Sequence, residues 1–152
     1  MLAEIKNGGC VELRTATAED LPRVLSLLGR TQLPTEGLAE ALPDFILAES
    51  EGRLVGVVGL ELYQESALLR SAAVEERWRG SGVGKVLVDR ALDLARERGV
   101  EDVYLLTTTA EGYFPKFGFV CVGRDSVVGG VRSSVEFETA CPTSATVMRK
   151  SL

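Results

Sequence analysis

The feature that most constrains the fold is a glycine-rich segment between an apolar run and an amphipathic stretch. Residues 67–74 are mostly apolar and predict a strand, whereas residues 82–98 repeat apolar positions with a helical period. Glycines stand at every second position between them: Gly80, Gly82 and Gly84. Glycine lets a backbone approach a ligand closely, and a helix start offers unpaired N–H groups and positive dipole charge. The segment therefore predicts a diphosphate-binding loop, with a turn that only links strand and helix as the alternative.

The spacing of the glycines excludes two common phosphate-binding loops. A dinucleotide fingerprint counted from Gly80 requires a glycine where Lys85 stands. A P-loop ending in Gly84-Lys85 requires a glycine at Arg79 and a serine or threonine after Lys85. The pattern that remains is Arg-x-x-Gly-x-Gly, and it resembles the acetyl-CoA pyrophosphate loop of the GNAT superfamily of N-acetyltransferases.

Composition limits the classes of protein to consider. With 152 residues, 45% of them hydrophobic, we expect one domain over residues 1–152, with residues 1–9 as a loose leader. The net charge of −5 argues against nucleic acid as a main partner, and no apolar run approaches the roughly 20 residues of a membrane span. The start of the chain lacks the apolar core of a signal peptide. The three cysteines, Cys10, Cys121 and Cys141, favour reduced thiols in the cytoplasm.

The chain contains no histidine, which narrows the chemistry further. Its absence excludes Ser-His-Asp triads, Cys-His nucleophiles and the usual zinc sites, so we expect no metal. A general base must then be a carboxylate, a tyrosine, a lysine, a cysteine or a bound water.

The predicted elements alternate in an order typical of a mixed α/β domain. Apolar alternation and turn residues predict strands, and apolar positions three and four apart predict helices. Expected strands cover residues 11–16, 45–48, 54–63, 68–74, 103–107, 119–122 and 145–148; expected helices cover residues 17–29, 36–42, 82–98, 110–117 and 131–139.

This order resembles the GNAT topology over nearly the whole chain. The resemblance implies a seven-stranded, mostly antiparallel mixed sheet that is flanked by helices and splayed between strands 4 and 5, where the pantetheine of acetyl-CoA lies. It also implies that backbone N–H groups near residues 72–74 polarise the thioester carbonyl. The implied cofactor-binding residues are Ala72, Ala73, Val74, Arg79, Gly80, Ser81, Gly82, Val83, Gly84 and Lys85.

A second segment, residues 113–119, resembles the aromatic helix of the family and its following Gly-Phe. Many members place a tyrosine five residues before the last phenylalanine, where it can protonate the leaving CoA thiolate. Phe114 occupies that position here, and Tyr113 stands one residue earlier. Because a shift of one helical residue turns a side chain by roughly 100°, Tyr113 is a candidate acid displaced from the position of the family's tyrosine.

Candidates for acceptor chemistry are polar residues at the expected edge of the wedge. Glu61 lies in an apolar strand, where a charge is costly unless it faces a pocket, and we predict it as the general base; an outward strand position is the alternative. Arg70 interrupts the fourth strand and could bind a substrate anion, or be a surface residue. Glu36 lies in the variable substrate loop of the family and is a second candidate base, while Thr107 and Thr108 end the fifth strand.

A narrower resemblance concerns the acceptor. The segments 33–38, 69–71, 104–112 and 141–145 look like those of an acetyltransferase branch linked to arsenic-resistance operons, whose relatives acetylate amino-acid-like herbicides such as phosphinothricin and its arsenic analogue. We therefore expect acetyl transfer to the primary amine of a small, amino-acid-like, arsenic- or phosphorus-containing molecule. A non-catalytic sensor of an acyl-CoA or a small ligand is the alternative, and the sequence leaves a homodimer open.

Overall fold

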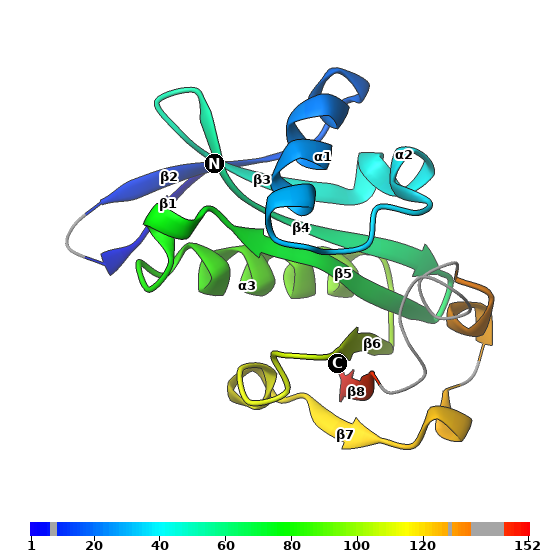
Figure 1. Ribbon diagram of the computed structural model, residues 1–152. Coiled ribbons are helices and arrows are strands. Elements are labelled where there is room, and N and C mark those ends of the chain that lie inside the picture. The colour runs from blue at the N-terminus through cyan, green and yellow to red at the C-terminus, as the bar shows by residue number, and fades with distance from the viewer. Residues whose placement is uncertain (7–8, 128, 135–144) are drawn as a thin grey trace.

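Eight strands form a single mixed sheet in the order β1-β2-β3-β4-β5-β6-β8-β7 (Figure 1). The computed structural model describes residues 1–6, 9–127, 129–134 and 145–152. Every neighbouring pair is antiparallel except β5 and β6, which run parallel. The strands are β1 (Leu2–Glu4), β2 (Cys10–Thr15), β3 (Phe45–Ser50), β4 (Arg53–Tyr63), β5 (Ser66–Val74), β6 (Asp102–Thr107), β7 (Val120–Val122) and β8 (Thr146–Ser151).

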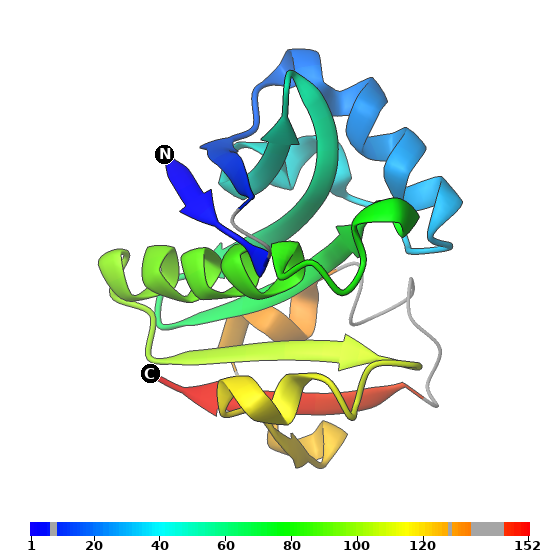
Figure 2. The same cartoon turned by 90° about the vertical axis from the view of Figure 1, so that its left-hand side faces the viewer.

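Helices cover both faces of the sheet, with α1 and α2 on one side and α3 on the other (Figures 1 and 2). None of the described helices is long and apolar enough to cross a membrane. The helices are α1 (Leu21–Arg30), α2 (Leu38–Ala41) and α3 (Val83–Glu97), and short 3₁₀ helices span Ala18–Asp20, Leu42–Asp44, Glu76–Trp78, Phe114–Phe117, Arg124–Ser126 and Gly129–Ser133.

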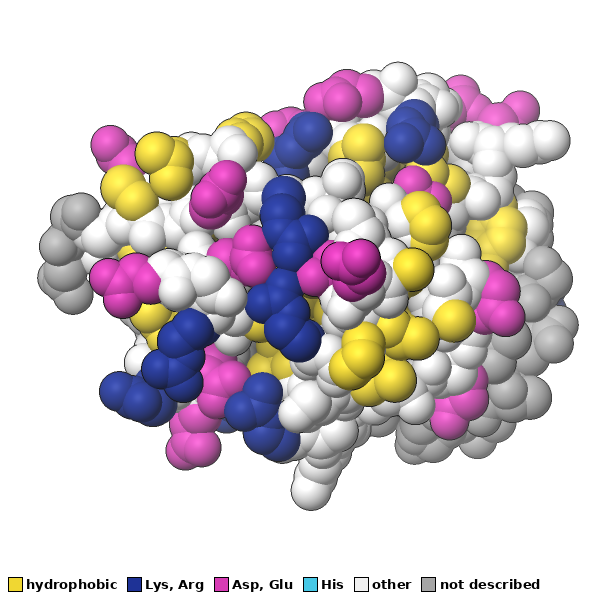
Figure 3. All heavy atoms as spheres, turned by 90° about the horizontal axis from the view of Figure 1, so that it is seen from above, with side chains coloured by type: hydrophobic (Ala, Val, Ile, Leu, Met, Phe, Trp, Pro, Cys, Tyr) yellow, Lys and Arg dark blue, Asp and Glu magenta, His cyan; other side chains and the backbone are white. Residues whose placement is uncertain are grey.

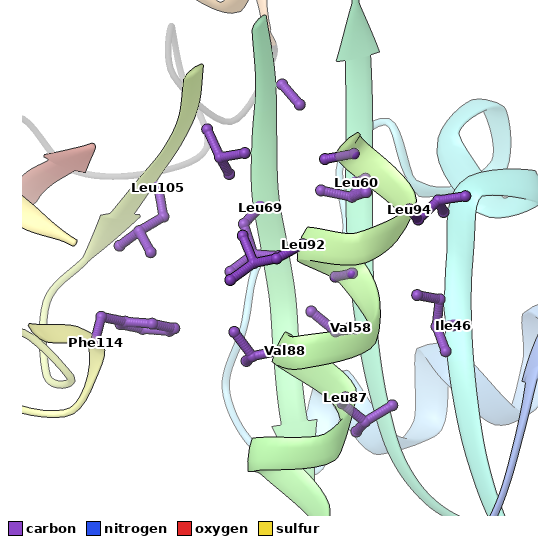
Figure 4. Close-up of a cluster of buried hydrophobic side chains, with 14 of the residues drawn as sticks. Ile46, Val58, Leu60, Leu69, Leu87, Val88, Leu92, Leu94, Leu105 and Phe114 are labelled. Carbon is purple, nitrogen blue, oxygen red and sulfur yellow. The ribbon is translucent and has the colours of Figure 1, made fainter. Parts of the chain in front are cut away.

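The apolar stripe of α3 explains where this helix lies. Its apolar positions recur every three to four residues and pack on β3, β4 and β5 (Figure 4). Leu87 and Val88 are almost fully buried in this layer, and Leu105 of β6 joins the same cluster. Phe114, in the 3₁₀ helix that follows β6 in the chain, belongs to the same cluster (Figure 4). The core therefore connects α3 to both halves of the sheet.

The predicted α/β fold is confirmed, but one strand and several helices differ from the prediction. The sheet has eight strands and not seven, because Leu2–Glu4 pairs with β2 inside the segment expected to be a loose leader. The helix predicted over residues 110–117 is a 3₁₀ helix of four residues, since Pro115 lacks the N–H that a regular helix needs there.

Two other predicted helices also differ from expectation. The helix predicted over residues 36–42 is reduced to α2 and the 3₁₀ turn that follows it, which contains Pro43. Of the segment 131–139, residues up to 133 form the end of a 3₁₀ helix, and residues 135–139 lie outside the described part of the chain.

The predicted splay of the sheet is present between β5 and β6, the fourth and fifth of the strands expected from the sequence. These strands pair over three residues each, from the Ser66–Asp102 pair to the Leu68–Tyr104 pair. Beyond that point β5 continues to pair with β4, and β6 with β8. The two halves of the sheet therefore separate toward the carboxyl ends of β5 and β6.

Candidate functional site

A cavity of about 580 Å³ lies where β5 and β6 separate. Its walls come from the carboxyl halves of both strands, the start of α3, the segment after β6 and the loop after α1. Among the residues predicted from the sequence, the cavity is lined by Glu36, Arg70, Ala72, Ala73, Val74, Gly84, Thr107, Thr108 and Tyr113. The remaining predicted residues, Glu61, Arg79, Gly80, Ser81, Gly82, Val83 and Lys85, are not part of the lining.

A β-bulge shapes the β5 wall of the cavity. Paired positions are two residues apart in β4, at Val57 and Gly59, but three apart in β5, at Ala73 and Arg70. Ser71 lies in this interval with a φ of 58°, a left-handed conformation that non-glycine residues rarely adopt. A bulge leaves its extra residue outside the ladder and re-aims the backbone. The β5 backbone therefore presents polar groups at the cavity wall.

The glycine-rich loop ends in an open helix start. Gly80 and Gly82 have φ values of 77° and 96°, which explains the need for glycine at both positions. In the described chain, no hydrogen-bond acceptor is paired with the backbone N–H groups of Val83, Gly84 and Lys85. These N–H groups and the helix dipole make the start of α3 suitable for an anion.

The side chains of this loop are mostly held by the protein itself. Arg79 is exposed, and its Nε donates to the carbonyl of Val74 at 3.4 Å. Lys85 pairs with Asp89 at 2.6 Å on the surface of α3. The Ser81 hydroxyl donates to a backbone carbonyl of its own loop. The backbone, more than the side chains, is therefore open to a ligand.

Tyr113 contacts the start of α3 at Gly84. A Cβ atom added at Gly84 would lie 2.9 Å from the Tyr113 hydroxyl oxygen and 3.6 Å from Val74. Because a Cβ atom essentially never comes so close to another heavy atom, glycine at this position lets the phenol oxygen reach the helix. The Tyr113 hydroxyl therefore lies at the end of the cavity that borders the glycine-rich loop.

Aromatic packing fixes the Tyr113 ring in this position. Its centroid lies 5.3 Å from that of Phe114 in an edge-on arrangement, and the Lys116 ammonium lies 3.9 Å from the ring centroid. Burial, followed by the charge of Asp89, raises the pKa of the Tyr113 hydroxyl, against a smaller opposite effect of Lys85. The phenol is therefore protonated at neutral pH.

Phe114, at the usual tyrosine position of the family, is a core residue here. Its side chain is buried and packs edge-on against Phe119 at 5.7 Å. Tyr113 and Phe114 both line the cavity, but of the two Tyr113 carries the hydroxyl. The one-residue shift in sequence thus still leaves a phenol at the cavity.

The opposite end of the cavity is formed by the loop after α1 and the end of β6. Glu36 lines the cavity from the loop, and Thr107 and Thr108 line it from the end of β6 and the residue after it. The Thr107 hydroxyl accepts the backbone N–H of Ala110 at 2.9 Å, which holds the turn after β6. This end therefore combines a carboxylate with hydroxyl groups.

Arg70 is buried at this end, with all its described contacts inside the protein. Its side chain has no exposed area, and Nη1 donates to the Glu61 carboxylate at 2.7 Å and to the Glu36 carbonyl at 2.8 Å. Nη2 lies 3.3 Å from the Pro34 carbonyl, and Nε donates to the Ser71 hydroxyl at 3.1 Å. The guanidinium that the sequence predicts as an anion site thus already has protein partners.

Glu61 lies behind Arg70 and outside the cavity lining. One carboxylate oxygen pairs with Arg70, and the other accepts hydrogen bonds from the Tyr63 hydroxyl and, at 2.7 Å, from the Ser134 hydroxyl. Burial alone raises the pKa of Glu61, but the donors Tyr63, Ser134 and Arg70 outweigh it and lower that pKa. A less basic carboxylate with these contacts does not have the geometry of the predicted general base.

Several lining residues were not predicted from the sequence. Gln32, Leu33 and Pro34 come from the loop after α1, and Thr109 and Ala110 from the turn after β6. Only the loop's prolines and its irregular pattern signalled a non-helical segment there. Its place against β5 depends on Arg70, a contact 34 residues away in the chain.

Two of the three cysteines lie in the described part of the chain. Cys10 and Cys121 are exposed free thiols, and Cys141 lies outside the described residues. Within residues 1–6, 9–127, 129–134 and 145–152, no group of three metal-binding side chains comes together.

Sequence comparison finds relatives among acetyltransferases. Residues 11–119 match the sequence profile of the acetyltransferase (GNAT) family. An uncharacterized N-acetyltransferase of Chlorobaculum tepidum is 34% identical over 55% of this chain and 54% of its own length. An amino-acid acetyltransferase of Mycobacterium tuberculosis is 32% identical over 70% of this chain and 67% of its own length. The chain thus spans only about half to two thirds of the length of these relatives.

Solved structures share the fold. The N-acetylglutamate synthase of Neisseria gonorrhoeae, complexed with coenzyme A and N-acetyl-glutamate, superposes with a TM-score of 0.80 at 21% identity, over 93% of this chain and 35% of that one. A Mycobacterium tuberculosis protein in complex with CoA and NLQ has a TM-score of 0.79 at 25% identity, over 93% of this chain and 99% of that one.

Proposed function

We propose that this chain, which belongs to the acetyltransferase (GNAT) family, transfers the acetyl group of acetyl-CoA to a primary amine. One observation carries the proposal: a single cavity runs from the open start of α3, past the β5 bulge, to a polar end beside the loop after α1. A diphosphate suits the first end, and an amine suits the carboxylate at the second. The thioester would then lie between them, within reach of an attacking nitrogen.

The cofactor end rests on backbone groups. The N–H groups at the start of α3, in the loop from Arg79 to Lys85, would bind the diphosphate of acetyl-CoA. The backbone of residues 72–74, next to the bulge, would donate to the thioester oxygen as negative charge develops on it. Preorganised donors of this kind stabilise a tetrahedral intermediate without reorganisation during the reaction.

The leaving thiolate would take its proton from Tyr113. The neutral amine nitrogen forms a bond to the carbonyl carbon, the carbon–sulfur bond breaks, and the thiolate accepts the phenolic proton. The nitrogen releases one proton to solvent as the amide forms, and the phenoxide regains a proton from solvent. The position of the phenol at the cavity supports this role. Burial raises the pKa of Tyr113, which keeps the phenol protonated at the pH of the reaction but makes it a weaker acid.

The acceptor would be held by Glu36, Thr107 and Thr108. A substrate ammonium is attracted by the Glu36 carboxylate, and it must lose a proton before it can attack the thioester. The contacts of Glu61 do not support it as the base, so we assign proton removal to solvent or to Glu36.

An amino-acid-like acceptor is the narrower form of the proposal. It is supported by the relative described as an amino-acid acetyltransferase and by the polar far end of the cavity. The proposal that the acceptor is an arsenic- or phosphorus-containing amino-acid analogue rests on the sequence resemblance alone. A cytoplasmic location and a homodimer also stay predictions.

A substrate panel tests the function. Purified protein is mixed with acetyl-CoA and a set of primary amines: amino acids, phosphinothricin, its arsenic analogue, and polyamines as acceptors without an anionic group. We expect steady release of CoA thiol, with an equal amount of acetylated product by mass spectrometry, for at least one amino-acid-like acceptor. Tight CoA binding with no turnover on any amine would instead support a sensor module.

A further inference from the structure

A single buried guanidinium holds the loop that forms the acceptor end of the cavity. Residues 31–37 form no regular helix or strand. Two of their backbone carbonyls, those of Pro34 and Glu36, accept hydrogen bonds from Arg70 at 3.3 and 2.8 Å. The Arg70 side chain has no exposed area. The loop is thus attached to β5 by a charged donor that water does not reach.

Glu61 holds that guanidinium in turn. Glu61 stands opposite Leu68 in the β4–β5 ladder, so Arg70, two residues further along, is its diagonal neighbour on the same face. The ion pair measures 2.7 Å. The second carboxylate oxygen accepts hydrogen bonds from the hydroxyl groups of Tyr63 and Ser134. The carboxylate is therefore fixed from two sides, and it can fix Arg70.

We propose that Glu61 and Arg70 form a positioning pair that holds residues 34–36 in place and so sets the affinity for the acceptor. The inference rests on the proposed function in one respect, namely that this end of the cavity receives the amine. Glu61 acts through Arg70 and the loop, and no proton passes through it. The one acidic side chain of this loop that lines the cavity, Glu36, would be aimed by this contact.

The physical reason lies in the burial of the charges. A buried guanidinium is stable only when it is paired and hydrogen-bonded. With a neutral side chain at position 61, Arg70 keeps its charge but loses the ion pair with Glu61. It would then move toward water or another partner, and the two loop carbonyls would lose their donor. The loop would loosen while the β4–β5 ladder stays paired.

The first test needs no acceptor. Hydrogen–deuterium exchange over residues 32–37, where the Gln32 and Leu33 amides donate to the carbonyls of Gly29 and Leu28 and can report loosening, is measured in the wild type, in Glu61→Gln and in Glu49→Gln. Glu49 is a matched control, because it is also a largely buried carboxylate that pairs with arginines, Arg14 and Arg23, but has no contact to this loop. We expect about tenfold faster exchange in residues 32–37 for Glu61→Gln, and no change there for Glu49→Gln. Unchanged exchange in Glu61→Gln overturns the inference.

The second test is kinetic and uses the acceptor that the substrate panel identifies. We expect Glu61→Gln to raise the acceptor KM by about tenfold or more, with a smaller change in kcat, the wild-type pH–rate profile and unchanged CoA affinity. A fall in kcat with an altered pH profile and an unchanged KM would assign Glu61 to proton transfer and overturn the positioning role.

Two further outcomes separate the inference from the proposed function. Absence of turnover in the wild type contradicts the proposed function, whereas the exchange experiment still decides whether the pair holds the loop. If Glu61→Gln does not fold, Arg70→Lys takes its place, since lysine keeps the charge but lacks the fork that reaches both carbonyls. The same increases in exchange and in KM are then expected, and their absence counts against the inference.

Discussion

At the scale of single residues, the contact between Tyr113 and Gly84 joins the two predicted halves of the cofactor site. The absent Cβ at Gly84 lets the phenol oxygen rest against the first turn of α3. Tyr113 also lines the cavity, and burial raises the pKa of its hydroxyl. A proton donor beside the place proposed for the leaving sulfur follows from this contact.

Replacing Tyr113 by phenylalanine tests that role. Phenylalanine keeps the aromatic packing and removes the proton, so we expect kcat to fall by about 10²-fold, the lower end of general acid catalysis, while CoA affinity stays unchanged. Steady-state kinetics with the acceptor from the substrate panel measure the effect.

Tyr104→Phe is the matched control, because Tyr104 is a buried tyrosine that does not line the cavity. Its kcat should equal that of the wild type. A normal kcat in Tyr113→Phe would mean that the thiolate leaves without help from this phenol.

At the scale of elements, a network of four charges ties the start of α1 to β2 and β3. Asp20 accepts hydrogen bonds from Arg14 and Arg23, each at 2.7 Å, and Glu49 pairs with the same arginines at 2.8 and 2.9 Å. The backbone N–H of Thr17 also donates to Asp20, as the predicted helix start requires. Seen from above, the molecular surface shows basic and acidic side chains next to one another (Figure 3).

The network predicts a pH-dependent loss of stability for Asp20→Asn. The bond from Arg14 is the main cause that lowers the Asp20 pKa far below its usual value, against the opposing effect of burial. The stabilisation is therefore complete above the unfolded-state pKa of about 4 and is lost as the pH falls toward the folded-state pKa. We expect Asp20→Asn to lower the free energy of unfolding by about 1–3 kcal/mol at pH 7, and by about 1 kcal/mol less at pH 3.

Urea unfolding at the two pH values measures this difference. Asp93→Asn is the control: Asp93 is an exposed carboxylate on α3 that pairs with Arg96 at 3.1 Å, and its loss should cost less than about 1 kcal/mol at either pH. An equal cost for Asp20→Asn at pH 7 and pH 3 would contradict the account of the network.

The elements also show what local sequence can predict. The glycine spacing and helical period around Gly82 located α3 and its loop, because both signals lie within about 20 residues of the chain. The strand at Leu2–Glu4 was missed because three residues carry no readable alternation, and it forms only by pairing with β2. The helix predicted over residues 110–117 is shorter in the structure, and Pro115 is the local signal for this. The prediction followed the family pattern and gave that proline too little weight.

At the scale of the whole molecule, the cavity exists because the sheet separates after three β5–β6 pairs. The sequence resemblance predicted this wedge, and nine of the residues singled out in the sequence line the cavity, while their roles stay predictions. It did not predict the contacts of Glu61, because a strand pattern does not reveal which donors meet a carboxylate. Nor did it predict how the loop after α1 reaches β5, since that depends on Arg70 and two backbone carbonyls distant in the chain.

The most direct test of the central claim is a calorimetric titration of CoA into the wild type, Gly82→Val and Gly99→Val. Both glycines have positive φ values, 96° and 78°, at opposite ends of α3, so both variants carry similar backbone strain. If the loop before α3 binds the diphosphate, the wild type and Gly99→Val bind CoA with equal affinity, and folded Gly82→Val binds at least about tenfold more weakly. Equal affinity in all three folded proteins would contradict the claim that this cavity and its helix start form the acetyl-CoA site.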